Sequence, residues 1–478
     1  MKNKLSIVIS NTAYTFIARL IEVFSSLAVI ALLSRYLGVN DFGLYLLYMA
    51  FIMVSIPVIG LSFPRILARD IAQRNNMAAE YLGVGITWNL FMIVFILGGL
   101  KFFVDTDKVF LYLLLIVNVG FISLTQTLNA LYTAFQRMVL ETVPTIVTSV
   151  TTIVFVFLTV YYDLGLITIF VVMAVANFFG LLTTYILIFK KFSILAVPSF
   201  NFQLIRYFFK ESVHLSVFHI LTQVYLYVGV FVLQFMATQS DVALFQAPFR
   251  FFTRLIIIPM SLMVAMLPVF SVLFDKKAAK AELTLTVNAT IKVLAVISMF
   301  FSIYGYFLSP YIISILLGEG FTDSVIVLKL MTAGIFFFFL NQFMECLFIA
   351  SKRQGYLVII QGVGLFVCMM LNVVFVNKFA YLGSAFAMFV SNMVIFIMSY
   401  YLFFDLLKAF VYKGLLIIVI GTLAGISTYI VSLWMNMFAA LLVGSLCLVC
   451  GLYLSKVVVK EEIVMLLGLL KAKRLYKH

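Results

Sequence analysis

The segment APFRFFTRLIIIPMSLMVAMLPVF, residues 247–270, decides the class of fold to which this chain belongs. Its only charged residues are Arg250 and Arg254, and most of the other side chains are apolar. A helix of roughly 20 apolar residues is long enough to cross a hydrocarbon core about 30 Å thick. The segment is therefore predicted to be a membrane-spanning helix that holds two permanent cations.

The same pattern recurs along nearly the whole chain. Of the 478 residues, 65% are hydrophobic and only 10% are charged, a composition that excludes an ordinary soluble fold. Backbone groups find no water partner inside a bilayer, and the apolar runs do not alternate as in a membrane β-barrel. We therefore predict an all-α polytopic membrane protein with about fourteen transmembrane helices. The predicted spans are 9–33, 42–66, 81–101, 109–134, 139–161, 164–189, 208–236, 242–270, 284–308, 323–350, 355–376, 380–403, 411–434 and 436–457.

Lysine and arginine residues in the loops and at the ends of these spans are divided unevenly between the two sides of the membrane. The segments on the side of the N-terminus hold 23 of them, whereas the other side holds only Arg35, Lys101, Lys108 and Lys378. Cytoplasmic loops are enriched in lysine and arginine, so both termini are predicted to be cytoplasmic. The net charge of +14 then reflects short loops that face anionic lipid headgroups, and we expect no nucleic-acid partner.

Short internal similarities indicate a repeated architecture. NDFGLY at 40–45 resembles SDVALF at 240–245, and ANFFGLLTTYIL at 176–187 resembles SNMVIFIMSYYL at 391–402. The matches occur in the same order, so we predict two pseudo-symmetric bundles of six helices followed by two extra helices. The predicted parts are an N-lobe at 1–189, a cytoplasmic linker at 190–207, a C-lobe at 208–403, and helices 13 and 14 with a basic cytoplasmic tail at 404–478.

Three stretches resemble polysaccharide flippases of the MOP superfamily, the group of Wzx-type O-antigen flippases and related polysaccharide transporters. RYLGVNDFGLY at 35–45 resembles the loop after their first helix. LGEGFTDSVIVLKLMTAG at 317–334 resembles the loop into their tenth helix, and LNVVFVNKFAYLGSAFAMFVS at 371–391 resembles their eleventh-to-twelfth junction. With the number of spans, the resemblance covers essentially the whole chain. It departs at Val39 and Asn40, where many relatives have a proline and an acidic residue, a change that a turn accepts.

The resemblance implies a two-lobed fold like that of MATE transporters, with a central cavity and alternating access. It implies that the chain flips a polyprenyl-pyrophosphate-linked oligosaccharide, such as an O-antigen repeat unit, from the inner to the outer leaflet of a bacterial inner (cytoplasmic) membrane. The implied partners are this lipid-linked glycan, membrane lipids and the polysaccharide polymerase machinery. We expect no enzymatic activity, no cofactor and no metal site, since the sequence shows no phosphate-binding GxxxxGK[ST] motif and no catalytic or metal-binding cluster.

Four cations inside the predicted spans are candidates for cargo binding. Arg250 and Arg254 lie four residues apart and so share one helix face, roughly 13 to 20 Å from the start of their span. Arginine stays protonated, and each central cation costs about 2.5–3.5 kcal/mol to insert into a membrane. Arg19 lies near mid-depth of the first span and Lys292 lies in the ninth. We predict that the three arginines bind the pyrophosphate, which accepts charge-assisted hydrogen bonds from guanidinium groups. Lys292 is predicted to extend the cationic, cargo-binding surface toward the cytoplasm.

The same charges have structural interpretations that stay open. Arg19 and Glu22 are one turn apart and can pair within one helix, and Arg250 and Arg254 can be neutralised by carbonyls and by Glu345. Glu22 and Glu345 are also the only carboxylates well inside the predicted spans. Since buried acids commonly bind coupling ions, we predict both as candidates for coupling to a proton or sodium gradient.

Two prolines fall at corresponding places in the two halves. Pro57 and Pro259 each remove a helix hydrogen bond and favour a kink, so we predict them as hinges, with plain packing kinks as the alternative.

Three other functions compete with the flippase. A multidrug exporter of the same fold would favour an acidic cavity for cationic drugs, whereas this one is predicted to be basic. A flippase for lipid II would share the basic cavity. A membrane polysaccharide polymerase or ligase would need catalytic or sugar-binding loops on the outer side, where the predicted loops are short.

Overall fold

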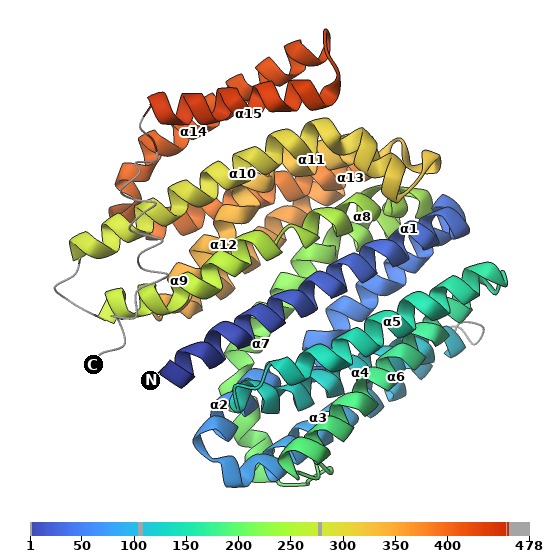
Figure 1. The fold of residues 1–478 in the computed structure, drawn as a ribbon. Coiled ribbons are helices and arrows are strands. Elements are labelled where there is room, and N and C mark those ends of the chain that lie inside the picture. Colours follow the sequence, from blue (N-terminus) through green and yellow to red (C-terminus); the bar gives the residue numbers. More distant parts are fainter. Residues whose placement is uncertain (1, 104–108, 276–279, 456, 458–478) are drawn as a thin grey trace. The chain divides into compact units, whose positions relative to one another are not determined.

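The computed structural model describes residues 2–103, 109–275, 280–455 and 457, and all regular structure within these ranges is helical (Figure 1). Short 3₁₀ turns at Asn75–Met77 and Glu319–Phe321 accompany the α-helices. The helices are α1 (Lys2–Gly60), α2 (Phe63–Gln73), α3 (Ala78–Phe103), α4 (Val109–Ala134), α5 (Val139–Tyr161), α6 (Gly165–Phe192), α7 (Phe202–Met236), α8 (Gln239–Arg254), α9 (Ile257–Asp275), α10 (Lys280–Leu316), α11 (Ser324–Ala333), α12 (Ile335–Ala350), α13 (Gln354–Leu402), α14 (Phe404–Ser432) and α15 (Met437–Leu454).

The number of spans agrees with the prediction once two long helices are divided. Among the described residues, eleven helices are long and apolar enough to cross a membrane, or twelve if α11 and α12, bent by 47°, form one span. Helix α1 has 59 residues and would be about 88 Å long if straight. It breaks at Gly38, and the 49-residue α13 breaks at Ala380. With each counted as two spans, the predicted all-α polytopic fold of about fourteen helices is confirmed.

Three spans predicted as continuous are broken in the structure. The span at 42–66 ends as a helix at Gly60 and resumes as α2 after Leu61 and Ser62, with Pro64 in its first turn. Proline is favoured there because first-turn N–H groups have no partner within the helix. The same applies to Pro259, which lies in the first turn of α9 after a break at residues 255–256. The third break separates α11 from α12 at Gly334.

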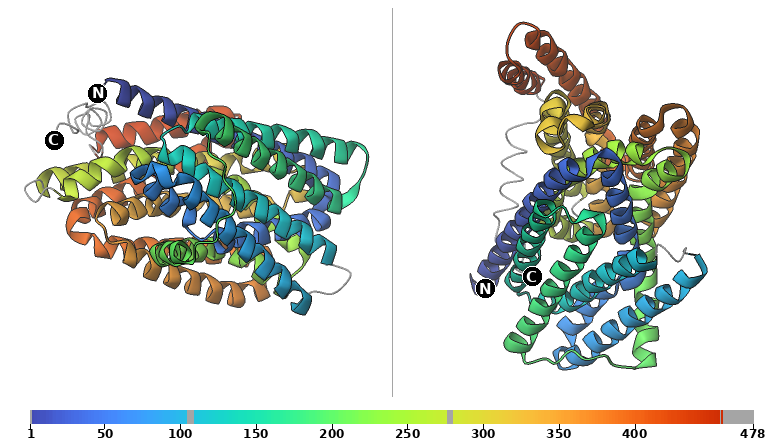
Figure 2. Two further views of the ribbon diagram at one scale, coloured as in Figure 1. Left: turned by 90° about the horizontal axis from the view of Figure 1, so that it is seen from below. Right: turned by 90° about the vertical axis from the view of Figure 1, so that its right-hand side faces the viewer.

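The first of two compact units comprises Met1–Gln234, Thr238–Ala243 and Ile315–Gly320. In it α1 packs against α4 and α5, while α6 packs against α4 and α5 (Figures 1 and 2). Helix α7 also belongs to this unit up to Gln234. The predicted division into lobes at 1–189 and 208–403 rests on sequence similarity between the halves, and it stays a prediction.

The segment between α6 and α7 is attached to α3. The N–H of Ser199 donates to the Gly83 carbonyl at 3.2 Å, and the Thr87 hydroxyl donates to the Ser199 carbonyl at 3.0 Å. A Cβ atom at Gly83 would overlap the carbonyl of Val197, so glycine permits this close approach. The connection to α7 is therefore fixed along its path within the first unit.

Buried amides set the register between α3, α4 and α6. The Asn89 amide donates to the Thr127 hydroxyl at 2.8 Å and accepts from the Ser123 hydroxyl at 2.5 Å. The Asn118 amide donates to the Phe170 carbonyl at 3.1 Å. Since a polar group without a partner is costly in a membrane, these bonds favour one helix alignment.

The second compact unit comprises Phe235–Ala237, Leu244–Ser314 and Phe321–His478. Helix α12 packs against α9 and α13, and α14 and α15 form a hairpin (Figure 1). The Asn288 amide of α10 donates to the Leu406 carbonyl of α14 at 2.7 Å. The hydroxyls of Tyr304 in α10 and Ser445 in α15 lie 2.6 Å apart. The two C-terminal helices are thus joined to α10 within the second unit.

Candidate functional site

Helix α8 has one aromatic face that is buried in the second unit. The rings of Phe245, Phe249 and Phe252 are stacked along it, with centroids 5.8 and 6.4 Å apart. All three side chains are buried, and Phe252 lies 4.8 Å from Phe338 of α12 between ring centroids. This contact fixes the rotation of α8 about its own axis.

The two predicted arginines lie on the other side of the same helix. At 3.6 residues per turn, Arg250 and Arg254 lie about 150° around α8 from the centre of the aromatic face. Both side chains are partly buried. The structure therefore separates an apolar anchoring face from a cationic face on one helix.

A third polar residue, which the sequence analysis did not identify, belongs to this cationic face. Gln246 precedes Arg250 by one turn, so Gln246, Arg250 and Arg254 follow at intervals of four residues. Gln246 is fully buried, and among the described residues neither atom of its amide has a hydrogen-bond partner. Buried polar groups are nearly always hydrogen-bonded, so this amide is a candidate position for a bound group. The four-residue spacing from Arg250 is visible in the sequence, but it singles out Gln246 only once the burial of the amide is known.

The cationic face ends at the break between α8 and α9. Arg254 is the last residue of α8, where a cation interacts favourably with the negative end of the helix dipole. Pro259 follows in the first turn of α9, and Pro57 lies three residues before the end of α1 at Gly60. Both predicted hinge prolines therefore adjoin a helix break, while a hinge motion at either stays a prediction.

Lys292 lies in α10, and its part in cargo binding stays a prediction. It is buried in α10, with only 7% of its surface exposed. It shares its side of the helix with Asn288, four residues before it, and with Met299, seven residues after it. Asn288 bonds to α14, and the Met299 sulfur packs against Gly421 of α14. Lys292 therefore lies on the side of α10 that packs against the C-terminal hairpin.

The remaining candidates are distributed over both units. Glu345 is partly buried in α12, next to Cys346, whose thiol approaches the Met263 carbonyl of α9 at 3.8 Å. Glu22 lies on α1 in the first unit with an exposed side chain. Arg19 also lies on α1, but its side chain falls outside the described residues. That Arg19 meets Arg250 and Arg254 around one anionic group stays a prediction.

At the break between α1 and α2, side chains of neighbouring helices form hydrogen bonds with the free backbone groups. The Trp88 indole N–H of α3 donates to the Ile59 carbonyl at 3.1 Å, and the Ser62 N–H donates to the Ser216 hydroxyl of α7 at 2.9 Å. Backbone freed by a break must find such partners in a membrane. Among the described residues, no group of three or more His, Cys, Asp or Glu side chains is placed to hold a metal ion.

Comparison with known proteins gives one family and one fold. A family model described as "Polysaccharide biosynthesis protein" matches residues 8–274. Among curated proteins, no sequence matches significantly. Among solved structures, the lipid II flippase MurJ in an inward closed conformation superposes with a TM-score of 0.74 and 16% identity, over 93% of this chain and 98% of that one.

Two further structures have the same architecture. An inward-facing multidrug resistance MATE family transporter of the MOP superfamily has a TM-score of 0.61 and 13% identity, over 82% of this chain and 99% of that one. A MOP superfamily transporter from Pyrococcus furiosus, described as having a binding pocket of reverse polarity, has a TM-score of 0.53 and 15% identity, over 84% and 96% of the two chains. These matches confirm the MATE-like fold that the sequence resemblance implied.

Proposed function

This chain belongs to the polysaccharide biosynthesis protein family, and we propose that it flips a polyprenyl-pyrophosphate-linked oligosaccharide from the inner to the outer leaflet. The fold that it shares with flippases and drug transporters of the MOP superfamily supports transport rather than bond-forming chemistry. The proposed setting is a bacterial inner membrane with both termini in the cytoplasm. The proposed cargo is the repeat unit of O-antigen or of another surface polysaccharide, delivered to the polymerase machinery.

The cationic face of α8 is the observation that carries this proposal. Arg250 and Arg254 are held opposite an aromatic anchor, and the buried amide of Gln246 stands one turn before them. Two guanidinium groups and an amide match the oxygens of a pyrophosphate, which accepts several charge-assisted hydrogen bonds. The sugars would travel within the cavity while the lipid tail stays in the bilayer.

Other residues have supporting roles in the proposal. Arg19 would add a third guanidinium from the first unit, and Lys292 would extend the positive charge along α10. Glu22 and Glu345 would couple transport to a proton or sodium gradient. Measuring transport in liposomes with and without each gradient tests that coupling, and equal rates under all conditions would leave both carboxylates without a coupling role.

The direct test replaces both arginines of α8. The double variant Arg250→Ala/Arg254→Ala is expected to insert normally into the membrane but to reduce surface glycan to background in cells that depend on this chain. The matched control, Arg250→Lys/Arg254→Lys, keeps the charge but loses bidentate bonding, so we expect partial export. Normal surface glycan with both alanines present would overturn the proposal.

A flippase for lipid II is the second candidate, since the MurJ structure superposes over 93% of this chain. Lipid II would present the same pyrophosphate to the same arginines. The two candidates are separated by supplying purified protein in liposomes with lipid II or with a polyprenyl-pyrophosphate-linked oligosaccharide, and by measuring which headgroup reaches the opposite leaflet.

A further inference from the structure

The segment that leads from α6 into α7 carries positive charge and no negative charge. Residues 190–210 read KKFSILAVPSFNFQLIRYFFK, in which the charged residues are Lys190, Lys191, Arg206 and Lys210. All four of these side chains are exposed. Residues 193–201, which lie between the two helices, are called the strap below, and both of its ends belong to the first compact unit.

The strap is fixed to the first unit along its length. In addition to the bonds of Ser199 with α3, the Asn201 amide donates to the Glu80 carboxylate of α3 at 2.9 Å. The oxygen of the same amide accepts from the Leu204 N–H at 3.2 Å, at the start of α7. At the other end, the Arg137 guanidinium lies 5.5 Å from the ring centroid of Phe192. The backbone of the strap therefore has one path along the unit.

The fixed backbone turns one set of apolar side chains outward. Ala196 is buried, and Ile194 packs against the core around it, whereas Leu195 and Val197 are exposed. Such alternation is expected of extended backbone, because successive side chains point to opposite sides. The exposure increases further along the chain, to 88% at Phe200 and 77% at Phe202. The outer side of the strap is thus apolar and aromatic.

The length of α6 places the strap at the surface of the membrane. Helix α6 has 28 residues and is about 42 Å long, which exceeds a hydrocarbon core of about 30 Å. The strap begins where this helix ends, and Figure 2 shows it running over the surface of the unit between α6 and α7. Aromatic side chains and cations are both typical of the region where the hydrocarbon meets the headgroups.

The other end of α6 also exposes aromatic side chains, but the charge near them differs. Tyr161 and Tyr162 are exposed at the turn between α5 and α6, and Asp163 follows them. The Asp163 carboxylate accepts from the Tyr36 hydroxyl of α1 at 2.8 Å. Exposed aromatic rings therefore occur at both ends of α6, whereas the four exposed cations lie at the strap.

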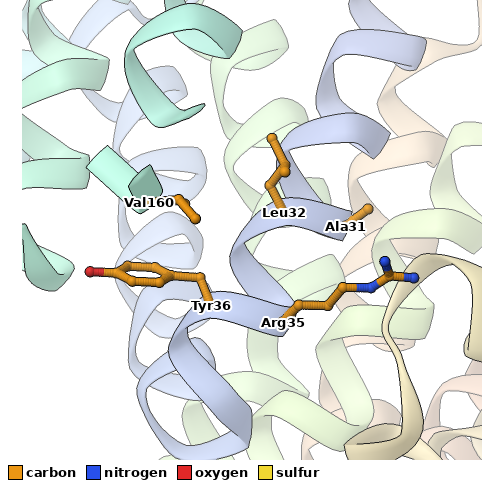
Figure 3. A pocket seen from close by; sticks show the side chains of 5 residues that line it. All are labelled: Ala31, Leu32, Arg35, Tyr36 and Val160. Atoms are coloured by element: carbon orange, nitrogen blue, oxygen red, sulfur yellow. The ribbon is translucent and has the colours of Figure 1, made fainter. Parts of the chain in front are cut away.

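The side chains of α1 beside this turn bond to the protein. The Arg35 guanidinium donates from Nη2 to the Ile315 carbonyl at 2.7 Å, and the Tyr36 hydroxyl also accepts from the Gly165 N–H at 2.9 Å. Figure 3 shows that Arg35 and Tyr36 point to opposite sides of α1. A pocket of about 300 Å³ lies here, lined by Ala31, Leu32, Arg35, Tyr36 and Val160. This end of the unit thus offers no comparable group of cations to an anionic surface.

We propose that the strap and the start of α7 form an anchor that binds anionic phospholipids, such as phosphatidylglycerol, at the surface of the predicted cytoplasmic leaflet. Phe200 and Phe202 enter the interfacial region, and the four cations at 190, 191, 206 and 210 contact the lipid phosphates. The bonds to α3 hold the backbone in place, so binding needs no refolding. This binding does not depend on the identity of the cargo.

A fluorophore on the strap tests the anchor. Cys447 and Cys450 are exposed and are replaced by serine, whereas the other two cysteines are buried. The full chain with Val197→Cys is labelled and placed in nanodiscs of phosphatidylcholine alone, or of phosphatidylcholine and phosphatidylglycerol in equal parts. We expect acrylamide to quench the fluorophore at least twofold less when phosphatidylglycerol is present. The matched control is a fluorophore at Tyr162→Cys, which should be quenched equally in both lipids.

Two sets of substitutions separate charge from apolar contact. Glutamine at positions 190, 191, 206 and 210 together is expected to abolish the effect of phosphatidylglycerol, whereas Lys190→Arg/Lys191→Arg should keep it. Phe200→Ser/Phe202→Ser should increase quenching in both lipids. Thermal unfolding checks that each variant is folded, and if the fourfold variant is not, Lys190→Gln/Lys191→Gln should reduce the effect by about half.

The outcomes that contradict the anchor are specific. Equal quenching of the Val197→Cys fluorophore in both lipids would overturn it, and so would an equal effect of phosphatidylglycerol at Tyr162→Cys. An effect of phosphatidylglycerol that survives glutamine at all four positions would overturn the role of the cations. Failure of the parent chain to move any lipid-linked glycan would overturn the proposed function but not the anchor, because the quenching is measured without cargo.

Discussion

The break after α1 and the break after α8 interrupt two predicted spans in different ways. At the first, Trp88 and Ser216 come from neighbouring helices and bond to the freed backbone. At the second, the N–H groups of Leu255 and Ile256 bond back to carbonyls of α8 itself, at 3.1 and 3.2 Å. The first break is thus tied to its surroundings, while the second is closed by its own helix.

Two buried polar side chains near the breaks, Ser216 and Gln246, also differ. Ser216 is buried and fully engaged, because it accepts from Ser62 and donates to the Ser212 carbonyl at 2.7 Å. Gln246 is equally buried, but its amide has no partner among the described residues. A polar group that is satisfied by the protein contributes to stability, whereas one that is not satisfied remains available to a ligand. The first break is thus held by contacts within the protein, whereas Gln246, two turns before the second break, belongs to the proposed cargo site.

The largest effect expected from this comparison is tested by removing one arginine from each unit. Arg250→Ala is expected to lower export by about 10-fold to 150-fold at unchanged protein level, since a charge-assisted bond contributes roughly 1.5–3 kcal/mol. Arg69 bonds to Asp70, Glu211 and Tyr207 within the first unit, so Arg69→Ala should keep export per folded molecule within threefold. Surface glycan, normalised to membrane-inserted protein, measures both. If both variants lost export equally, Arg250 could not be distinguished from Arg69 as a cargo-binding residue.

The next effect concerns stability at the first break. Ser216→Ala leaves the Ser62 N–H without its partner inside the protein, and we expect a loss of about 1–3 kcal/mol in unfolding free energy. Export per folded molecule should change little. Thermal unfolding in detergent, followed by the fluorescence of a thiol probe, gives the stability. If the variant were as stable as the parent chain but defective in export, the break between α1 and α2 would have a role in transport.

A smaller change in stability, of opposite sign to that of Ser216→Ala, is expected when Gln246 is replaced. Gln246→Leu removes an amide that has no partner in the protein, so stability should rise by about 1 kcal/mol. Export should fall severalfold, because the cargo loses a hydrogen-bonding group. The same unfolding and glycan measurements apply. Lower stability together with normal export would show that the amide is part of the packing.

The smallest effects are expected at the prolines. Pro57→Ala and Pro259→Ala each restore a backbone N–H next to an existing break, and we expect export to change less than fivefold. Transport rates in liposomes are the suitable measurement, since surface glycan saturates. A tenfold or larger loss from either substitution would support the hinge role.

The helical membrane fold was predictable because each span carries its own signal of some twenty apolar residues, independent of its neighbours. The breaks were not, because hydropathy averages over a span and is blind to one turn of non-helical backbone. Pro64 and Pro259 lie at two of the breaks. From sequence alone, however, a proline in the first turn of a new helix cannot be distinguished from a proline that kinks a continuous helix. Gly334 carried no comparable signal.

For the candidate site, charge was visible and environment was not. Arg250 and Arg254 stood out because a cation in an apolar run is rare. Gln246 did not, because an uncharged amide in a span is ordinary until its burial and its lack of a partner are known. The contact of Asn288 with α14, which places Lys292 beside the C-terminal hairpin, depends on residues about 120 positions apart. Such pairing depends on tertiary packing and leaves no local pattern.

The residence of Ile315–Gly320 in the first unit has a consequence for biosynthesis. Helices are made in chain order, and the ribosome adds roughly 80 residues after Gln234 before this segment emerges. Until then, Ser34 and Arg35 lack the carbonyls that they bond in the finished protein. The earlier half of the chain therefore reaches its final form only after much of the later half has entered the membrane.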